Sequence, residues 1–369
     1  MYAKKTVWHL CSNRWNSAIT EYALSAAQAL HLCAWQSVYS GLKDSPGSQR
    51  ARALRLPGID FTGFGLGQLG MLRSEALRLR PDVILLYGGP ETFASRFLPA
   101  GQRWRFRGQD RDVSEPLSPI ATRWSLGHCR GVITPSRLVQ ERFAVHLSKP
   151  VHSVPLGLDA GRFQFVAPAW AAARSRPTLR IIGRLDPIKG HREFFPLYRR
   201  MLEIWPASAP LPWLEIVGQE ANLKAEDLRH AAYAAGLKEQ RDWALRIERV
   251  ADLPALMSGT HLGVISSLGS EVICRVAEEF LLCGSPVAVS GVGSLAEVLF
   301  SPEAGTSYRI GDESAQARLL VESLWSAFAE PQEPRKLRAQ AARQHFSLER
   351  MGEALEHILL TPSKSGKGP

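Results

Sequence analysis

The stretch "TLRIIGRLDPIKGH" (178–191) decides the fold of this chain. Its opening run is apolar and β-branched, as in a buried strand, and Gly183 lets the chain turn at the end of that run. Arg184 and Lys189 follow in the loop before the next helical segment. Open α/β sheets bind ligands outside the carboxyl ends of their strands. The stretch therefore predicts a strand that presents two cations to a crevice.

Short apolar runs alternate with amphipathic segments on both sides of this stretch. Strands are predicted at 5–11, 81–88, 130–136, 178–183, 213–218, 261–267 and 286–291. Helices are predicted at 17–30, with Ser17 as N-cap, and after Ser136. This alternation is typical of an α/β protein in which helices cover parallel sheets.

The length of 369 residues exceeds what one hydrophobic core usually organises, so two doubly wound domains are expected. The segment 150–177 is rich in Pro, Gly and Ala and predicts the hinge, with domains at 1–165 and 166–345. Residues 334–360 predict helix with a break near Phe346 and Ser347, and 346–360 is expected to cross back to the first domain. Residues 361–369 predict a disordered tail.

Composition indicates a soluble globular protein, with 45% apolar and 22% charged residues. No apolar run approaches the ~20 residues that cross a bilayer, and the first fifteen residues read as a strand after a short basic start rather than a signal peptide. The five cysteines form no Cys-x-x-Cys pair, which argues against a zinc site and favours a reducing compartment. We therefore expect a cytoplasmic protein.

The positive charge lies in the first part of the chain. Residues 1–165 hold 21 Lys and Arg against 11 Asp and Glu, whereas residues 166–369 hold 24 of each. Such a field attracts an acidic partner: nucleic acid, an anionic membrane surface or a phosphorylated substrate. The arginines lack the aromatic interleaving of single-strand binders, so we favour a membrane surface or acidic substrate over nucleic acid. An idle basic surface is the alternative.

Two acids flank a second candidate site, "GSEVICRVAEEFLLCGSPVAVSG" (269–291). A helix that begins directly after Glu271 leaves the N–H groups of residues 272–274 as an anion site. Eight residues of helix place Glu279 about 12 Å further along, comparable to the span from a sugar across two phosphates to a ribose. Each carboxylate can accept hydrogen bonds from a pair of hydroxyls. The alternative for Glu279 is a surface pair with Arg275, and Glu278 is expected to be exposed.

These motifs together resemble the family 4 retaining glycosyltransferases of two-domain (GT-B) fold. The resemblance covers about residues 130–350 and includes "GVITPSRLVQERF", "GRLDPIKGH", "LEIVGQE", Glu271-x7-Glu279, "CGSPVAVSGVGSLAEVL" and "EAGTSYRIGD". It implies two Rossmann-like domains that face a central cleft. It also implies that Glu271 meets the donor sugar, Glu279 meets the ribose, and Arg184 and Lys189 neutralise the departing diphosphate.

Further donor contacts follow from the same resemblance. They are Gly183, the backbone of Val272, Ile273 and Cys274, and Arg249 and Val250 for the nucleobase. The chain departs from the family pattern where bulky side chains replace glycines after Glu271. The glycine pair after the first strand is also replaced, by "SNRWNS" (12–17). There Asn13, Asn16 or Ser17 are expected to face the donor phosphates, and Trp15 the acceptor.

The stretch "RFRGQDRD" (105–112) is expected in the crevice-facing loops of the first domain. There Asp110 is predicted to orient the acceptor hydroxyl, while Arg107 or Arg111 meets an acidic acceptor. Asp110 and Asp112 also spell Asp-x-Asp, which we interpret as coincidence, so no metal is expected. His128 and His261 are predicted to be structural, and His191 receives no role.

The prediction is thus a retaining glycosyltransferase that needs no metal or other cofactor. Its donor would be a UDP-sugar, with GDP- and ADP-sugars as alternatives, and its acceptor an acidic glycan or glycolipid of the bacterial envelope, such as lipopolysaccharide core. The enzyme would be cytoplasmic and peripheral on the inner membrane face. A nucleotide-sugar epimerase and a non-catalytic nucleotide-sugar binder are the alternatives. A dehydrogenase is disfavoured, because no Gly-x-Gly-x-x-Gly follows the first strand.

Overall fold

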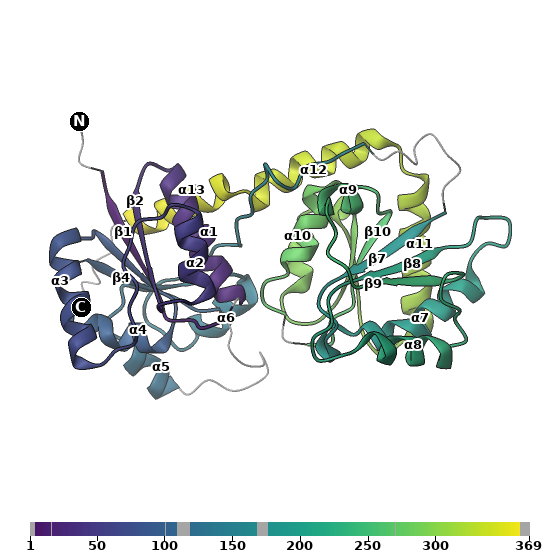
Figure 1. The fold of residues 1–369 in the computed structure, drawn as a ribbon. Helices are drawn as coiled ribbons and strands as arrows, with labels where there is room; N and C mark the ends of the chain where they lie inside the picture. The colour runs from purple at the N-terminus through teal and green to yellow at the C-terminus, as the bar shows by residue number, and fades with distance from the viewer. Residues whose placement is uncertain are drawn as a thin grey trace. The chain divides into compact units, whose positions relative to one another are not determined.

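The computed structural model describes residues 4–15, 17–99, 101–108, 119–167, 176–269 and 271–361, with no side-chain description at 119 and 121–123. The chain divides into two compact units (Figure 1). The first unit runs to Leu158 and includes Phe346 onward, and the second unit is Asp159–His345. Asn16, Asp110 and the predicted tail from 362 lie outside the described residues.

The first unit contains a parallel six-stranded sheet. Its strands are β1 Thr6–Cys11, β2 Gln36–Gly41, β3 Val83–Leu86, β4 Gln102–Phe106, β5 Gly131–Thr134 and β6 Val151–Ser153, in the order β2-β1-β3-β4-β5-β6. Its helices are α1 Ala18–Leu32, α2 Pro46–Ala53, α3 Leu66–Leu79, α4 Gly89–Ala94, the 3₁₀ turn η1 Ser95–Phe97, α5 Pro119–Leu126, α6 Arg137–Ala144 and α13 Leu348–Leu360. The predicted caps are confirmed, because Ser17 accepts a hydrogen bond from the N–H of Thr20 and Ser136 from that of Val139.

The last helix of the chain packs against α1 in the first unit. Trp35 donates its indole N–H to Glu356 at 2.8 Å. Gly352 permits this approach, since a Cβ there would lie 2.5 Å from the carbonyl oxygen of Ala29. The predicted helix break is confirmed: α12 (Gln332–Phe346) ends at Phe346, and Ser347 caps α13.

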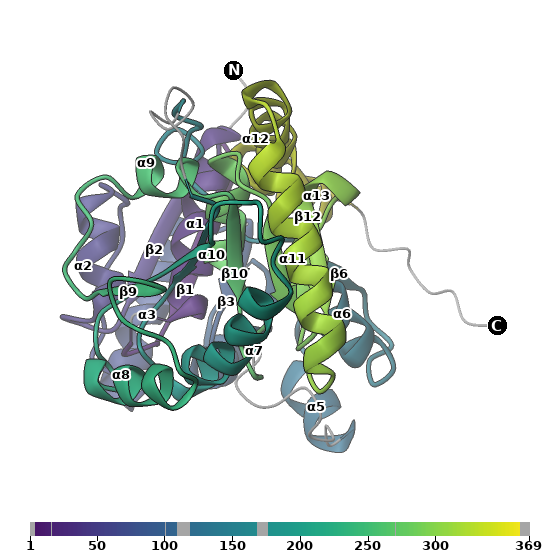
Figure 2. The ribbon, with the colours of Figure 1, turned by 90° about the vertical axis from the view of Figure 1, so that its right-hand side faces the viewer.

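The second unit repeats the architecture of the first. Its strands are β7 Thr178–Ile182, β8 Trp213–Val217, β9 Trp243–Arg246, β10 Leu262–Ile265, β11 Val287–Ser290 and β12 Gly305–Tyr308, in the order β12-β11-β10-β7-β8-β9. Its helical segments are η3 Pro187–Lys189, α7 His191–Ile204, α8 Ala225–Ala234, α9 Leu253–Ser258, α10 Arg275–Leu282, η4 Leu295–Val298, η5 Pro302–Ala304 and α11 Glu313–Ala329, followed by α12. Helices α7, α8 and α11 pack together on one face of the sheet, and α9 and α10 pack on the other (Figure 2).

All seven predicted strands are present in the two sheets, with ends that differ by one or two residues. The prediction of 105–112 as a loop was partly wrong, because Arg105 and Phe106 belong to β4. In each unit the strand order reverses beside the first strand. These reversals lie between β1 and β3 and between β7 and β10. Such topological switch points are where open α/β sheets form crevices.

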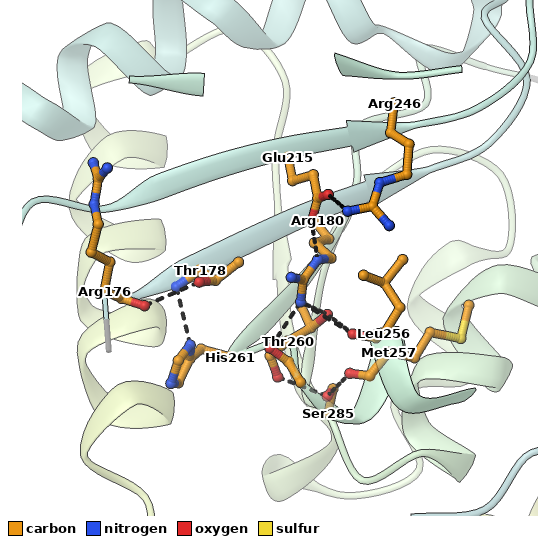
Figure 3. Close-up of polar contacts among 11 residues, drawn as sticks. Arg176, Thr178, Arg180, Glu215, Arg246, Leu256, Met257, Thr260, His261 and Ser285 are labelled. Atoms are coloured by element: carbon orange, nitrogen blue, oxygen red, sulfur yellow. Dashed lines mark hydrogen bonds and ion pairs between the residues drawn. The ribbon is translucent and has the colours of Figure 1, made fainter. Parts of the chain in front are cut away.

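A buried ionic cluster fixes α9 to the sheet of the second unit (Figure 3). Arg180 of β7 pairs with Glu215 of β8 at 2.6 Å and donates to the carbonyls of Leu256 and Gly259 at the end of α9. Arg246 pairs with the other carboxylate oxygen of Glu215 at 2.9 Å. Burial lowers the pKa of Arg180, which Glu215 partly offsets. The cluster therefore sets the position of α9 relative to the strand that leads into the predicted cation loop.

Candidate functional site

A cavity of about 410 Å³ lies at the switch point of the second unit, and we call it the switch-point cavity. It is lined by the carboxyl ends of β7 and β10, which are neighbours in the sheet, and by the residues that follow them. Much of the predicted site comes together in its wall. The predicted residues in the lining are Gly183, Arg184, Lys189, Glu271, Ile273, Cys274 and Glu279. Arg162, Phe163, His191, Leu253 and Arg275 line it as well.

One side of the cavity is built around Glu271. The ammonium of Lys189 forms an ion pair with its Oε1 atom, and the hydroxyl of Ser267 donates to the same oxygen at 2.7 Å. Glu271 is 7% exposed, so its charge has little water around it. A carboxylate anchored through one oxygen can present the other to a ligand hydroxyl.

The cation loop is fixed against the segment after β10. Ser266 donates its hydroxyl to the carbonyl of Lys189 at 2.9 Å, and the N–H of Leu268 donates to the carbonyl of Ile188 at 2.8 Å. Gly190 adopts φ +68°, and a Cβ there would lie 2.1 Å from the Ser266 carbonyl oxygen. Only glycine allows this approach without strain. Lys189 is therefore held in place before any ligand arrives.

Gly183 does not need a left-handed conformation. It is not among the positive-φ glycines, and a Cβ at this position would meet no atom within 4 Å. The expectation that glycine permits the turn here was wrong. Because Gly183 lines the cavity, the missing side chain instead leaves room for a ligand.

The loop after β11 positions Glu271 from the opposite direction, and the sequence did not indicate this role. The N–H of Ser294 donates to the carbonyl of Glu271 at 3.0 Å. Gly293 adopts φ +55°, and a Cβ there would lie 2.0 Å from the same carbonyl oxygen. The available signal was the Gly-x-Gly-Ser stretch that directly follows a buried strand.

Helix α10 begins later than predicted. It starts at Arg275 with Cys274 as N-cap, so residues 272–274 form a loop, and the 12 Å helical rise from Glu271 to Glu279 does not apply. The hydroxyl of Ser294, in the loop after β11, donates to the carbonyl of Val272 at 2.9 Å. This contact and the β-branched side chain of Val272 both disfavour a helical backbone at this position. Ile273 and Cys274 line the cavity, whereas Val272 is absent from the lining.

Glu279 lies in the cavity wall and also forms the pair proposed as its alternative. Arg275 donates its Nε–H to Oε1 of Glu279 at 2.7 Å, and both residues line the cavity. Glu279 is only 4% exposed, so the pair is part of the site rather than of a solvated helix surface. Arg275 thereby adds its charge to those of Arg162, Arg184 and Lys189 in the cavity lining.

The prediction that Glu278 is exposed was wrong. Its side chain is buried, because α10 packs against α9, β10 and β11. Burial raises the pKa of Glu278 well above its usual range, and the adjacent Glu279 adds to this effect. Glu278 is therefore part of the buried side of the helix, whereas Glu279 lines the cavity.

His191 has a structural contact in the cation loop. Its Nε2 atom lies 2.9 Å from the carbonyl oxygen of Arg184, which can only accept, so Nε2 carries the proton. Burial lowers the pKa of His191. His128 and His261, which the sequence predicts to be structural, also form hydrogen bonds within the fold. His128 bonds to the Ser95 hydroxyl at 2.9 Å, and His261 accepts from the N–H of Thr178 at 3.1 Å.

The remaining predicted residues are not in the lining of this cavity. Arg249 and Val250 follow β9 and are not in the lining, although Leu253 shortly after them is. Asn13 donates to the Ser17 hydroxyl at 2.7 Å and accepts from the N–H of Trp15 at 3.0 Å. The polar groups of Asn13 and Ser17 are thus used locally at the start of α1, and their contact with a donor stays a prediction.

Known structures share this fold. HepE from Anabaena, solved in complex with UDP, superimposes with a TM-score of 0.76 at 17% identity, over 96% of this chain and 99% of that one. The lipopolysaccharide outer core galactosyltransferase WaaB superimposes with a TM-score of 0.70 at 9% identity, over 96% and 99%. Two parallel six-stranded α/β units with a charged cavity at a switch point therefore define the protein as one of GT-B fold.

The sequence comparison is more specific. Residues 166–344, which lie in the second unit, match the family described as glycosyl transferases group 1. The 2-deoxystreptamine N-acetyl-D-glucosaminyltransferase of Streptomyces fradiae is 26% identical over 196 residues, which are 52% of this chain and 44% of that protein. The chain thus spans less than half the length of this curated relative.

Proposed function

We propose that the protein is a retaining glycosyltransferase that moves a sugar from a nucleotide-diphosphate sugar to a hydroxyl of an acceptor. One observation carries the proposal: Arg184, Lys189, Glu271 and Glu279 all line a single cavity at a switch point. Cations suit a diphosphate, and carboxylates suit the hydroxyls of sugar and ribose.

Lys189 and Arg184 would act mainly on the leaving group. As the bond from the anomeric carbon to the diphosphate oxygen breaks, negative charge grows on that oxygen. The fixed cations and the first N–H groups of α10 stabilise this charge without reorganising. The acceptor hydroxyl forms the new bond on the same face, and its proton passes to the departing phosphate oxygen. Glu271 would hold the sugar in position for this step.

The donor is proposed to be a UDP-sugar. HepE, which shares the fold, was solved with UDP, with UDP-glucose, and with UDP and glucose. GDP- and ADP-sugars stay as alternatives, because the predicted base contacts at Arg249 and Val250 lie outside the cavity lining.

The acceptor is proposed to be an acidic glycan or glycolipid of the bacterial envelope, such as lipopolysaccharide core, reached at the cytoplasmic membrane face. The net positive charge of residues 1–165 supports an acidic acceptor. None of the described helices is long and apolar enough to cross a membrane. Asp110, which lies outside the described residues, keeps its predicted role toward the acceptor hydroxyl.

A thermal-shift screen over UDP-, GDP- and ADP-sugars, with EDTA present, tests the donor. A ligand at about a hundred times its Kd raises the unfolding free energy by about 2.7 kcal/mol. We expect one nucleotide class to raise Tm in the wild type and to lose most of its effect in Glu279→Ala. If no nucleotide sugar raises Tm, the proposal is wrong.

Release of nucleotide diphosphate from the bound donor then tests the reaction class. We expect release to be slow alone and accelerated by acceptor-containing membrane extract. An epimerase would instead interconvert the sugar and keep the nucleotide attached, without any acceptor. A non-catalytic binder would shift Tm but release nothing.

A further inference from the structure

Three arginines project from one side of β4, a strand inside the sheet of the first unit. β4 pairs with β3 on one side and β5 on the other. Alternate residues share a face, so Arg103, Arg105 and Arg107 lie on one side, while Trp104 and Phe106 are buried on the other.

The first of these arginines has a structural explanation. Arg103 donates to the carbonyls of Ser95 at 2.9 Å and Leu98 at 2.5 Å, and so holds η1 against the strand. The other two lie near the carboxyl end of β4, where they line a separate cavity of about 110 Å³ together with Arg96 of η1. We call this the arginine cavity.

The chemistry of the arginine cavity suits an anion. Its lining also contains Thr92, whose hydroxyl donates to the carbonyl of Gly88 at 2.6 Å, and Ser125, and none of the described residues in the lining is acidic. Arg105 is 3% exposed and donates to the carbonyl of Leu86 at 3.0 Å. Clustered guanidinium groups are typical of phosphate sites, because their forks match phosphate oxygens.

The size of the arginine cavity limits the ligand group. Water occupies about 30 Å³ per molecule in the liquid, so 110 Å³ holds roughly four heavy atoms. That is the size of a phosphate or a carboxylate group. A whole nucleotide does not fit.

Exposed apolar side chains surround this cavity, and we call Phe93, Phe97, Ile120 and Trp124 the aromatic rim. Their exposed fractions are 51%, 51%, 82% and 62%. Phe93 stacks on Trp124 with centroids 6.5 Å apart and contacts Phe97 at 5.7 Å. Arg96 lies over the Trp124 ring at 4.5 Å. Ile120 precedes Trp124 by one turn of α5, which packs against α4 (Figure 1).

An exposed apolar cluster around a cationic pocket is the arrangement that an anionic bilayer requires. Apolar patches on a protein surface mark interaction sites, and Trp is favoured where one end of the side chain is apolar and the other wet. Basic residues near an anionic leaflet add attraction, and the net charge of +10 in residues 1–165 has the required sign. A soluble phosphate would use the arginines but not the rim.

We propose that this face of the first unit docks on an anionic membrane, with a lipid phosphate in the arginine cavity and the aromatic rim in the interfacial layer. That the bound lipid is the glycosyl acceptor rests on the proposed function, whereas lipid binding itself does not. The proposal gives the acidic acceptor a definite position at the end of β4.

Sedimentation of the full chain with vesicles tests the docking surface. Vesicles of phosphatidylcholine alone are compared with vesicles that also contain phosphatidylglycerol. The double variant Arg96→Gln/Arg107→Gln removes two charges, and Phe93→Ser/Trp124→Ser removes the rim. Arg105 is left unchanged because it is buried within the fold. Arg55→Gln and Tyr233→Ser are matched controls at exposed positions outside the arginine cavity and the rim.

We expect the wild type and both controls to sediment only with the anionic vesicles. The arginine variant should need at least about tenfold more anionic lipid for half-binding, since each basic residue contributes about 1 kcal/mol near such a surface. The rim variant should lose the binding that persists at high salt. Equal binding by the double variants and the wild type, or an equal loss in the controls, would overturn the proposal.

Two further measurements separate the possible ligands and the two proposals. If inorganic phosphate raises Tm in the wild type but not in the arginine variant, and neither sediments with vesicles, the site takes a soluble anion and lipid docking is wrong. The shift of Tm by the donor sugar nucleotide should be the same in all variants. Its absence from every variant and from the wild type would remove the proposed function while leaving the vesicle result to stand.

Discussion

The two units have the same strand reversal but use it differently. Between β7 and β10 the second unit has an open cavity with cations and carboxylates in its wall. At the corresponding point between β1 and β3, the first unit contains the carboxylate of its own residue Glu91. The N–H and hydroxyl of Ser12 donate to the two oxygens of this carboxylate, at 2.7 and 2.6 Å. Gly88 has no room for a side chain, as a Cβ would lie 2.3 Å from Glu91.

This difference shows that topology provides a crevice and that the residues decide whether a ligand can enter. The donors at the end of β1 already hold an internal anion, so a second anion would have to displace a buried carboxylate. In the first unit the arginine cavity lies instead at the end of β4, two strands away from β1 in the sheet. The expected glycine pair is missing after β1, and Ser12 in that stretch binds the carboxylate of Glu91 instead.

The largest effect, a loss of reaction rate, is expected when Lys189 of the open crevice is replaced. Replacing Lys189 with Ala removes a fixed charge from the leaving group, and one preorganised contact of this kind is worth about 3–4 kcal/mol, or roughly a hundred- to a thousandfold in kcat. The measurement is the rate of nucleotide release at saturating donor. Lys238→Ala, at an exposed site outside the cavity lining, should stay near wild type. Equal rates for the two variants would contradict the role of Lys189.

Filling the open crevice should make the second unit resemble the first. A Cβ at Gly183 meets no protein atom within 4 Å, so Gly183→Leu is expected to fold with a wild-type far-UV spectrum. Its side chain would compete with the donor for the cavity. If this costs as much as overpacking, about 1–3 kcal/mol, donor affinity falls roughly five- to 150-fold. Isothermal titration with the donor measures this loss, and unchanged affinity would show that the donor does not lie beside Gly183.

The charged residues of the open crevice could be predicted because their position depends on local sequence. A buried strand followed directly by Arg184 and Lys189 fixes where these side chains emerge. The spacing of Glu271 and Glu279, taken together with this Arg/Lys pair, selected the two acids. The start of α10 could not be predicted. It depends on Gly293 and Ser294, which hold the Glu271 backbone from a loop about twenty residues later.

The arginine cavity could not be predicted for a related reason. Arg103, Arg105 and Arg107 alternate with Trp104 and Phe106, a pattern that equally describes a strand with one solvated face. Whether that face is solvated depends on α4, η1 and α5, which cover it in the fold. The burial of Glu278 was missed for the same reason, because it depends on how α10 packs against α9, β10 and β11.

Opening the closed crevice should reduce stability without creating a donor site. In Glu91→Ala the N–H and the hydroxyl of the half-buried Ser12 both lose their acceptor. Such a loss costs about 1–3 kcal/mol of unfolding free energy. Urea denaturation followed by tryptophan fluorescence measures the change, with Glu353→Ala at an exposed site as control. A variant as stable as the wild type would mean that Glu91 is not the internal anion of this crevice.

The smallest effect is a loss of unfolding free energy at acidic pH. We expect it from His9 in the sheet of the first unit and from His261 beside the sheet of the second unit. Burial lowers the pKa of His9 on β1 to about 3, and burial with nearby Arg335 and Arg180 lowers that of His261, just before β10, to about 3. The native state keeps both rings neutral, while the unfolded state binds a proton near pH 6.5. Unfolding free energy therefore falls as pH drops below 6.5, by about 1 kcal/mol per histidine between pH 7 and pH 5.5.

The variant His261→Asn tests this dependence in the second unit alone. An Asn side-chain oxygen can accept the N–H of Thr178, as Nδ1 of His261 does, but it takes up no proton in this range. We expect the urea transition of this variant to shift less between pH 7 and pH 5.5 than that of the wild type, by about 1 kcal/mol. A transition that shifts as much as in the wild type would place the acid sensitivity outside the His261 cluster.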